Sequence, residues 1–248
     1  MQAVAGEVEQ YTDRGYLVLE ALISGDRCQH YRGVFDELVA RSRSLTEDGD
    51  GFHLAPDRDG RPTPGLLHKV QGVCVVEPRV LELAREPGIL EHVERLIGPN
   101  LDVFGTKFFP MHTPGATSTG WHQDNYYFGT QSERVVSCAI YLHPIGPDNG
   151  CLRVVPGSHR TGQLVNHRPG AGEYAHGAWT EVDDEQAVDI LCPPGTVVLF
   201  SANLLHGARP NLSGRPAYRT AWHYIPADLD LPMFRRGGYR DRHILREG

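Results

Sequence analysis

Short apolar runs separated by turn residues fill the second half of the chain and constrain its fold more than any other feature. Gly, Pro, Asn and Asp bound these runs, which is typical of strands joined by tight turns. The runs are Leu101–Phe109, Val135–Leu142, Cys151–Val155, Ala187–Leu191, Thr196–Phe200 and Tyr218–Ile225. Short strands at this spacing predict a closed β-barrel or jelly roll. The 28 glycines and 18 prolines fit a turn-rich β architecture better than a helical bundle.

The first hundred residues follow a helical pattern instead. Between Ser24 and Ser44 the apolar residues recur at spacings of three and one, as on an amphipathic helix. Leu45 to Leu66 is polar and rich in Gly, Pro and Asp, which predicts a long mobile or functional loop. Arg79 to Ile97 is helical in pattern, with Pro87 and Gly88 dividing it into two short helices.

No linker separates the helical part from the strands, so we expect one domain over residues 1–248. The predicted fold is mainly β with flanking α-helices. Residues 1–100 provide helical support and a lid loop, and residues 101–226 form a double-stranded β-helix core (jelly roll, cupin-like) packed against the N-terminal helices. Residues 227–248 form a C-terminal tail, and Gly162 to Glu181 is expected to be an exposed insertion.

Charge and composition exclude several classes of protein. The net charge is -7, which disfavours nucleic acid as a partner because that binding depends on clustered Lys and Arg. No apolar stretch is long enough for a membrane helix, and the mean hydropathy is -0.37. The five cysteines are scattered without a CxxC pair, and the N-terminus lacks a secretory signal pattern. These features predict a cytoplasmic protein, and they leave its oligomeric state open.

The segment Gly120-Trp121-His122-Gln123-Asp124 is the most informative local motif. On a strand, His122 and Asp124 lie two residues apart and point to the same face, so they offer two adjacent ligands for a divalent metal. His206, after the apolar run that begins at Thr196, is the best candidate for a third ligand. Two histidines and one carboxylate make the facial triad of non-haem Fe(II) oxygenases. Taken alone, an HxD pair is more often two polar residues on a surface strand.

Arg219 lies thirteen residues after His206, on the next predicted strand. A guanidinium fixed there pairs well with a carboxylate, so a barrel interior with a metal and this arginine can take a 2-oxo acid, which would chelate the metal at one end and pair with Arg219 at the other. The alternative is an ordinary surface ion pair.

Four stretches of the chain resemble the phytanoyl-CoA dioxygenase family of Fe(II)/2-oxoglutarate-dependent oxygenases. Residues 121–124 are similar to its WHQD motif, residues 149–159 to its NGxLxxxPGSH segment, and residues 206–213 to HGSxPNxS. A weaker fourth match is residues 13–19, which are similar to the family's DGYxxL opening. The order and spacing of these motifs cover nearly the whole chain.

The resemblance implies that His122, Asp124 and His206 bind Fe(II), with 2-oxoglutarate and O2 as cosubstrates. The family's 2-oxoglutarate arginine follows the distal histidine by eleven or thirteen residues, where this chain has Ala217 and Arg219; Arg215 is the reserve candidate. The family often has a lysine in a KxPG-like stretch, but residues 112–115 read His-Thr-Pro-Gly, so Lys107 is a further cosubstrate-binding candidate.

The resemblance also implies hydroxylation of an unactivated C–H bond in a small molecule, with release of succinate and CO2. A specialised metabolite is one such substrate. Desaturation, epimerisation and oxidative cyclisation use the same cofactors and stay open, as do a zinc-dependent hydrolase and a non-catalytic ligand-binding jelly roll. Candidates for the substrate pocket are His68, Gln71, Trp121, Asn125, Tyr127 and His223.

Overall fold

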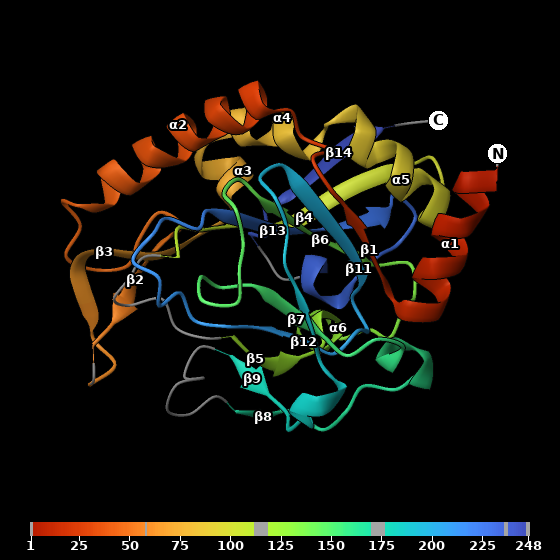
Figure 1. The fold of residues 1–248 in the computed structure, drawn as a ribbon. Helices are drawn as coiled ribbons and strands as arrows, with labels where there is room; N and C mark the ends of the chain where they lie inside the picture. The colour runs from red at the N-terminus through yellow and green to blue at the C-terminus, as the bar shows by residue number, and fades with distance from the viewer. Residues whose placement is uncertain (1, 58, 112–118, 170–176, 236–237, 247–248) are drawn as a thin grey trace.

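Two antiparallel sheets, one large and one small, face each other and form the body of the protein (Figure 1). The computed structural model describes residues 2–57, 59–111, 119–169, 177–235 and 238–246. The large sheet has the order β1-β11-β6-β13-β4-β3-β2, with β14 also paired to β4, and the small sheet has the order β10-β7-β12-β5. The large-sheet strands are β1 (Tyr16–Leu19), β2 (Phe52–Pro56), β3 (Pro62–Gln71), β4 (Leu101–Phe109), β6 (Val136–Tyr141), β11 (Thr196–Ser201), β13 (Arg219–Pro226) and β14 (Arg242–Arg246). The small-sheet strands are β5 (Thr119–His122), β7 (Leu152–Val154), β10 (Val188–Ile190) and β12 (His206–Ala208).

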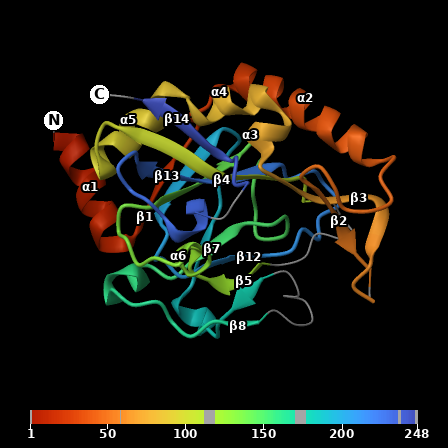
Figure 2. The same cartoon turned by 180° about the vertical axis from the view of Figure 1, so that it is seen from behind.

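Helices cover the outer face of the large sheet, on the side away from the small sheet (Figures 1 and 2). They are α1 (Gln2–Arg14), α2 (Gly25–Ser42), α3 (Val73–Val76), α4 (Leu81–Ala84) and α5 (Pro87–Ile97). Helix α2 begins after Ser24, whose side chain accepts a hydrogen bond from the Arg27 N–H. Its apolar face is buried on the sheet, where the ring of Phe35 stacks on Phe108 of β4 with centroids 4.2 Å apart. The amphipathic pattern between Ser24 and Ser44 is thus confirmed.

The alternation of side chains along the central strands divides the interior into two parts. On β6, Val136, Cys138 and Ile140 pack against the helices, whereas Ser137, Ala139 and Tyr141 face the small sheet. Both faces of the large sheet are therefore covered, which explains why its strands are nearly continuous apolar runs. The predicted strand Leu101–Phe109 coincides with β4, and the mainly β jelly-roll fold is confirmed.

Two segments differ from the expectation. The supposed loop from Leu45 to Leu66 contains β2 and the first half of β3, which pair as a hairpin and extend the large sheet at its edge. The expected tail at 227–248 contains a 3-10 turn at Pro232–Arg235 and strand β14, which pairs with β4. Both segments are polar and interrupted by Gly or Pro because they lie at the periphery of the sheet, so their strands lack a clear apolar signal.

Short elements in the insertion at 162–181 form a separate small ladder. Strands β8 (Arg168–Pro169) and β9 (Ala178–Trp179) pair with each other, below the small sheet in Figure 1. Within the described part of the chain, every helix is too short or too polar to cross a bilayer.

The hydroxyl of Tyr224 ties the large sheet to the helical layer, and its removal tests this link. Tyr224 accepts a hydrogen bond from the Trp222 indole N–H and donates one to the carbonyl of Ala84 at the end of α4, both at 2.9 Å. Because Tyr224→Phe leaves both buried groups unpaired, we expect the free energy of unfolding to fall by about 1–3 kcal/mol, measured by urea denaturation. A loss below about half a kcal/mol would contradict this account.

Candidate active site

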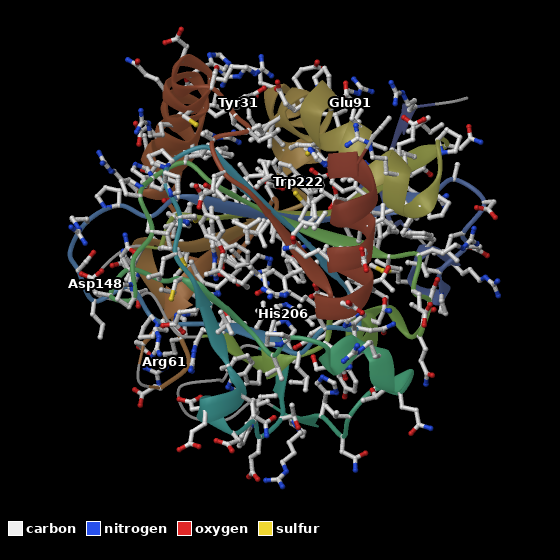
Figure 3. All side chains as sticks on the ribbon, turned by 45° about the vertical axis from the view of Figure 1, so that its right-hand side comes forward. Tyr31, Arg61, Glu91, Asp148, His206 and Trp222 are labelled. Carbon is white, nitrogen blue, oxygen red and sulfur yellow. The ribbon has the colours of Figure 1, made fainter. Side chains whose placement is uncertain are left out.

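A cavity of about 530 Å³ lies between the large and small sheets. That volume is in the range of small-molecule binding sites. Figure 3 shows His206 in this interior region, whereas Arg61 and Asp148 lie at the periphery of the molecule. The described residues that line the cavity include all three predicted metal ligands, together with Arg219 and Lys107.

His122, Asp124 and His206 come from three elements and meet at one point of the cavity wall. His122 ends β5 and lies directly opposite His206, the first residue of β12. Asp124 does not continue the strand, as the HxD spacing suggested, but begins the short helix α6 (Asp124–Phe128). Its carboxylate oxygens lie 3.5 Å from His122 Nε2 and 3.7 Å from His206 Nε2. Potential ligand atoms of the three residues lie within 4.8 Å of one another.

Backbone carbonyls orient both imidazole rings for metal binding. The Nδ1 of His122 lies 2.8 Å from the carbonyl oxygen of Gly120, and the Nδ1 of His206 lies 2.9 Å from that of Leu204. A carbonyl only accepts, so each Nδ1 carries the proton and each Nε2 presents its lone pair. Metal-binding histidines in proteins are held in the same way.

Electrostatics keep Asp124 and His206 in the protonation states that a metal requires. Burial alone would raise the pKa of Asp124, but His206, His223 and His122 outweigh it and hold this pKa well below its usual range. Burial, with help from His122, lowers the pKa of His206 to about 4. At neutral pH the carboxylate is therefore charged and the His206 imidazole is neutral, so this donor set fits a divalent iron ion.

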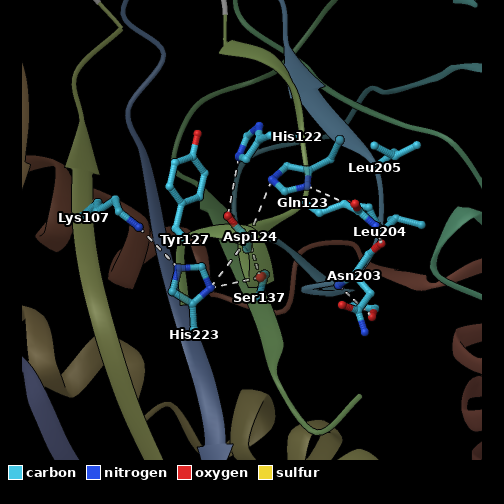
Figure 4. Close-up of polar contacts among 12 residues, drawn as sticks. Lys107, His122, Gln123, Asp124, Tyr127, Ser137, Asn203, Leu204, Leu205 and His223 are labelled. Carbon is cyan, nitrogen blue, oxygen red and sulfur yellow. Dashed lines mark hydrogen bonds and ion pairs between the residues drawn. The ribbon is translucent and has the colours of Figure 1, made fainter. Parts of the chain in front are cut away.

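A chain of hydrogen bonds links Asp124 to Lys107 through two further side chains (Figure 4). The Ser137 hydroxyl donates to Asp124 Oδ2 at 2.6 Å and lies 3.0 Å from His223 Nδ1, and the Lys107 ammonium lies 3.3 Å from His223 Nε2. Since an ammonium only donates, Nε2 of His223 accepts and Nδ1 carries the proton. This chain fixes one oxygen of Asp124 and leaves the other for a metal.

The ring of His223 is held by its surroundings. It packs against Phe104 and Phe128, and Gly105 leaves room for it, because a Cβ there would lie 3.0 Å from His223 Cδ2. Gly105 also has a φ of 62°, which strongly favours glycine. Burial lowers the pKa of His223 to about 3, so the ring is neutral.

Amide side chains anchor the turn between His122 and Asp124. Gln123 donates to the Asn203 carbonyl at 2.7 Å and accepts from the Val165 N–H at 2.8 Å. Asn125 donates to the side chain of Asn203 at 2.7 Å. Asn125 is fully buried and does not line the cavity.

Arg219, at the start of β13, is the buried cation of the cavity. Its guanidinium lies over the ring of Phe109 and donates to the Gly150 carbonyl at 3.3 Å. Burial lowers the pKa of Arg219. Beside it, the buried hydroxyl of Tyr141 has no hydrogen-bond partner among the described residues. Arg219 and Tyr141 thus present polar hydrogens that a bound carboxylate would satisfy.

Arg215, the reserve candidate, lies outside the cavity. Its side chain is 67% exposed and pairs with Asp148 at 3.2 Å, because it belongs to the loop before β13. It is therefore not placed to bind a cosubstrate in this cavity. The family-like stretch at residues 112–115 lies outside the described residues.

Four of the six predicted pocket residues line the cavity: His68, Gln71, Tyr127 and His223. Trp121 does not, because it points outward and stacks with Arg153.

Three polar residues that line the cavity were not predicted from the sequence: Ser137, Tyr141 and Tyr239. Ser137 had a signal, since it is the one polar residue in the run Val135–Leu142 apart from the Tyr141 hydroxyl. Tyr239 had none, because it reaches the cavity from the presumed tail.

The fold and the cavity define a class of protein, the Fe(II)- and 2-oxoglutarate-dependent oxygenases. A jelly roll encloses a His-Asp-His cluster with a buried arginine in the same cavity. The chain belongs to the phytanoyl-CoA dioxygenase (PhyH) family, whose model matches residues 11–221. It is accordingly a non-haem iron dioxygenase with 2-oxoglutarate as cosubstrate.

Known relatives agree with this family, and a solved structure has a similar fold. The chain is 24% identical over 247 residues to a probable alpha-ketoglutarate-dependent hypophosphite dioxygenase of Stutzerimonas stutzeri, covering 97% of this chain and 85% of that protein. It is 28% identical over 235 residues to a probable phytanoyl-CoA dioxygenase of Caenorhabditis elegans, covering 88% and 74%. Its fold is similar to EvdO2 from Micromonospora carbonacea var. aurantiaca complexed with 2-oxoglutarate, with a TM-score of 0.72, 23% identity and 90% of each chain covered.

Metal binding by the cluster is tested with Co(II), whose visible spectrum reports its ligands. We expect His206→Ala to abolish binding at the site. Ser137→Ala should weaken it by roughly 10- to 100-fold, because the serine orients the carboxylate of Asp124. His30→Ala is the control, because His30 is an exposed histidine of α2 that does not line the cavity. Unchanged Co(II) affinity in His206→Ala would show that the metal binds elsewhere.

A further prediction concerns Lys69, a partly buried residue of β3 that lines the cavity. Burial, and then the charge of Lys107, lower the pKa of Lys69 from 10.5 to about 8. The unfolded chain therefore binds more protons between these values, and this group adds stability as pH rises through that window. At pH 7 we expect Lys69→Met to raise the free energy of unfolding of the metal-free protein by about 1–3 kcal/mol.

The advantage of Lys69→Met should shrink from pH 8 to pH 10, because the folded wild-type protein then holds the lysine uncharged and the cost of removing its proton falls as the pH approaches 10.5. Urea denaturation at pH 7, 9 and 10 measures the difference. A variant that is less stable than wild type at pH 7 would contradict the account.

Proposed function

We propose that this dioxygenase hydroxylates an unactivated C–H bond of a small molecule and releases succinate and CO2. The observation that carries the proposal is the placement of His122, Asp124 and His206 together with Arg219 in one cavity. Two histidines and a carboxylate on one side of a metal leave its other positions open for a cosubstrate and O2. When bound there, Fe(II) and 2-oxoglutarate supply the oxidising chemistry, and the protein supplies placement.

In this proposal each polar residue of the cavity has a separate task. His122 and His206 bind the metal through Nε2, and Asp124 binds it through the oxygen that Ser137 leaves free. Arg219 binds the distal carboxylate of 2-oxoglutarate, with the Tyr141 hydroxyl beside it. The guanidinium is suited to this because burial removes competing water and strengthens the pairing.

Apolar side chains exclude water from the place where the substrate would react. Met111, Phe109, Phe128 and Met233 line the cavity. The insertion at 162–181 is held against this part of the cavity. The Tyr127 hydroxyl of α6 donates to the Ala178 carbonyl of β9 at 3.1 Å and accepts from the Ala178 N–H at 2.8 Å. A dry cavity protects the oxidising reaction from side reactions with solvent.

Desaturation, epimerisation and oxidative cyclisation need the same residues and remain alternative outcomes. One solved structure with the same fold is named as the epimerase SnoN in complex with Fe3+ and alpha ketoglutarate, at 19% identity and a TM-score of 0.71. A zinc-dependent hydrolase would leave Arg219 without a task. We place the reaction in the cytoplasm, where the five unpaired cysteines stay reduced, and without nucleic acid as a partner.

The test is the visible charge-transfer band that appears when a 2-oxo acid chelates Fe(II), recorded without oxygen. We expect the wild-type protein to form the band and Arg219→Ala to need roughly 10- to 100-fold more 2-oxoglutarate, because a charge-assisted pair is lost. Arg215→Ala, the matched control, should behave as wild type because that side chain is exposed.

Absence of the band in folded wild-type protein would overturn the proposal. A band weakened equally in both arginine variants would remove Arg219 from its proposed task. Product analysis under oxygen then separates hydroxylation from the alternative outcomes.

A further inference from the structure

The C-terminal segment brings a phenol hydroxyl to the cavity. Met233 and Tyr239 both line the cavity, although they lie after the last long strand, β13. Tyr239 is half-buried, so its ring is packed while part of the side chain stays open to the cavity. Tyrosine combines an apolar ring with one polar group, which makes it a frequent anchor for small ligands.

Contacts with β4 fix the position of Tyr239. The carboxylate of Asp241 accepts from the Thr106 N–H at 2.6 Å and from the Thr106 hydroxyl at 2.7 Å. The ring of Tyr239 packs against Phe234, with centroids 5.5 Å apart, and Phe234 packs edge-on against Phe104. Tyr239 is thus held in place by its own segment, and a side chain that is already ordered lowers the entropic cost of binding a ligand.

The hydroxyl of Tyr239 has a proton to give. The Gly105 N–H donates to it at 3.1 Å, and within the described part of the chain this is its one hydrogen bond. Burial, and then the negative charge of Asp241, raise the pKa of Tyr239 above its usual value, so the phenol keeps its proton at neutral pH. The oxygen therefore accepts from the backbone, and the proton is available to a ligand in the cavity.

The backbone does not depend on this hydroxyl. The Gly105 N–H is shared between two acceptors, because it also donates to the Asp241 carbonyl at 3.2 Å. Removal of the Tyr239 hydroxyl would leave that second bond in place. A purely structural task is therefore a weak explanation for the hydroxyl at this position.

The hydroxyl lies on the Asp124 side of the cavity. A Cβ built on Gly105 would lie 3.0 Å from His223 Cδ2 and 4.0 Å from the Tyr239 oxygen, so the imidazole and the phenol flank the same glycine. The other edge of the imidazole faces the metal-binding cluster, with His223 Nδ1 3.7 Å from Asp124 Oδ2 (Figure 4). A ligand group bonded to Tyr239 would thus share the cavity with the proposed metal.

Apolar side chains line this part of the cavity. Phe128 of α6 lines it and belongs to an apolar cluster with Phe104, against which Met233 packs. Lys107, a candidate for the cosubstrate, lies beyond His223 and is not needed for a contact with Tyr239. One neutral donor beside apolar groups fits a ligand with a carbon skeleton and a neutral acceptor atom.

We propose that the Tyr239 hydroxyl donates a hydrogen bond to a neutral oxygen of the primary substrate, a carbonyl or an ether. Phe128 and Met233 contact the carbon skeleton beside that oxygen. Tyr239 is then a specificity-determining residue that the C-terminal segment contributes to the cavity. Only the name of substrate for this ligand rests on the proposed function.

The test follows Tyr239 directly by ¹⁹F NMR of protein labelled with 3-fluorotyrosine. The chain has 10 tyrosines, and Tyr239→Phe assigns the signal of Tyr239. Zn(II) takes the place of Fe(II), and 2-oxoglutarate is added first, to saturation. The probes are cyclohexanone and δ-valerolactam, with methylenecyclohexane as a control of the same shape that lacks the oxygen. Titrations that follow the signals of each probe give its dissociation constant.

We expect cyclohexanone or δ-valerolactam to shift the Tyr239 signal. In Tyr239→Phe the affinity for that probe should fall roughly 2- to 10-fold, because one neutral hydrogen bond is lost, whereas the affinity for methylenecyclohexane should stay the same. Tyr126→Phe is the matched control, since Tyr126 is exposed and does not line the cavity, and it should change neither affinity. The midpoint of urea denaturation should be the same in Tyr239→Phe and wild type, because Gly105 retains its second acceptor.

Three results would overturn the proposal. The first is equal affinity of the oxygen-containing probes for wild type and Tyr239→Phe, and a lower denaturation midpoint in that case would assign the hydroxyl a structural task. The second is a Tyr239 signal that neither oxygen-containing probe shifts. The third is a signal that 2-oxoglutarate alone shifts to completion while it excludes the probes, which would assign the hydroxyl to the cosubstrate.

Failure of the proposed function is a separate result, seen as a missing charge-transfer band with Fe(II). The same probes are then titrated into the metal-free protein. A Tyr239 signal that shifts with the oxygen-containing probes supports the hydrogen bond to an acceptor oxygen, and an unmoved signal refutes it.

Discussion

The antiparallel pairing of β5 with β12 places His122 directly opposite His206, and the rest of the site depends on this register. A shift of one residue would turn either histidine away from the cavity, because side chains alternate between the faces of a strand. The turn into α6 then returns Asp124 to the same point, and the amides of Gln123 and Asn125 fix that turn to Asn203. Backbone geometry thus brings the three side chains of the cluster together, and side-chain contacts hold the turn between them in place.

Charge is distributed unevenly between the outside of the protein and its cavity. The chain as a whole has a net charge of -7, yet the described cavity wall has three basic side chains and one carboxylate. An acidic exterior weakens non-specific contacts with other anions, while the cavity retains Arg219 as the cation proposed to bind the 2-oxo acid. This arrangement lowers stability, since a buried lysine with a pKa of about 8 opposes folding at neutral pH.

Sequence patterns predicted those features that local rules determine. The helix over 24–44, strand β4 and the three residues of the metal-binding cluster follow from apolar periodicity and motif spacing. The hairpin of β2 and β3 and the strand β14 did not, because edge strands rich in polar residues and Gly or Pro resemble loops. Contacts between residues far apart in the sequence could not be predicted either. Ser137, for example, contacts Asp124 and His223 only once β6 and β13 pair in their register.

The most direct test of the account is a crystal structure of the protein grown without oxygen in the presence of Mn(II) and 2-oxoglutarate. The account predicts the metal on Nε2 of His122, Nε2 of His206 and one oxygen of Asp124, with the distal carboxylate of 2-oxoglutarate on Arg219. A metal bound by other residues, or a distal carboxylate held by Lys69 and Lys107, would contradict the account.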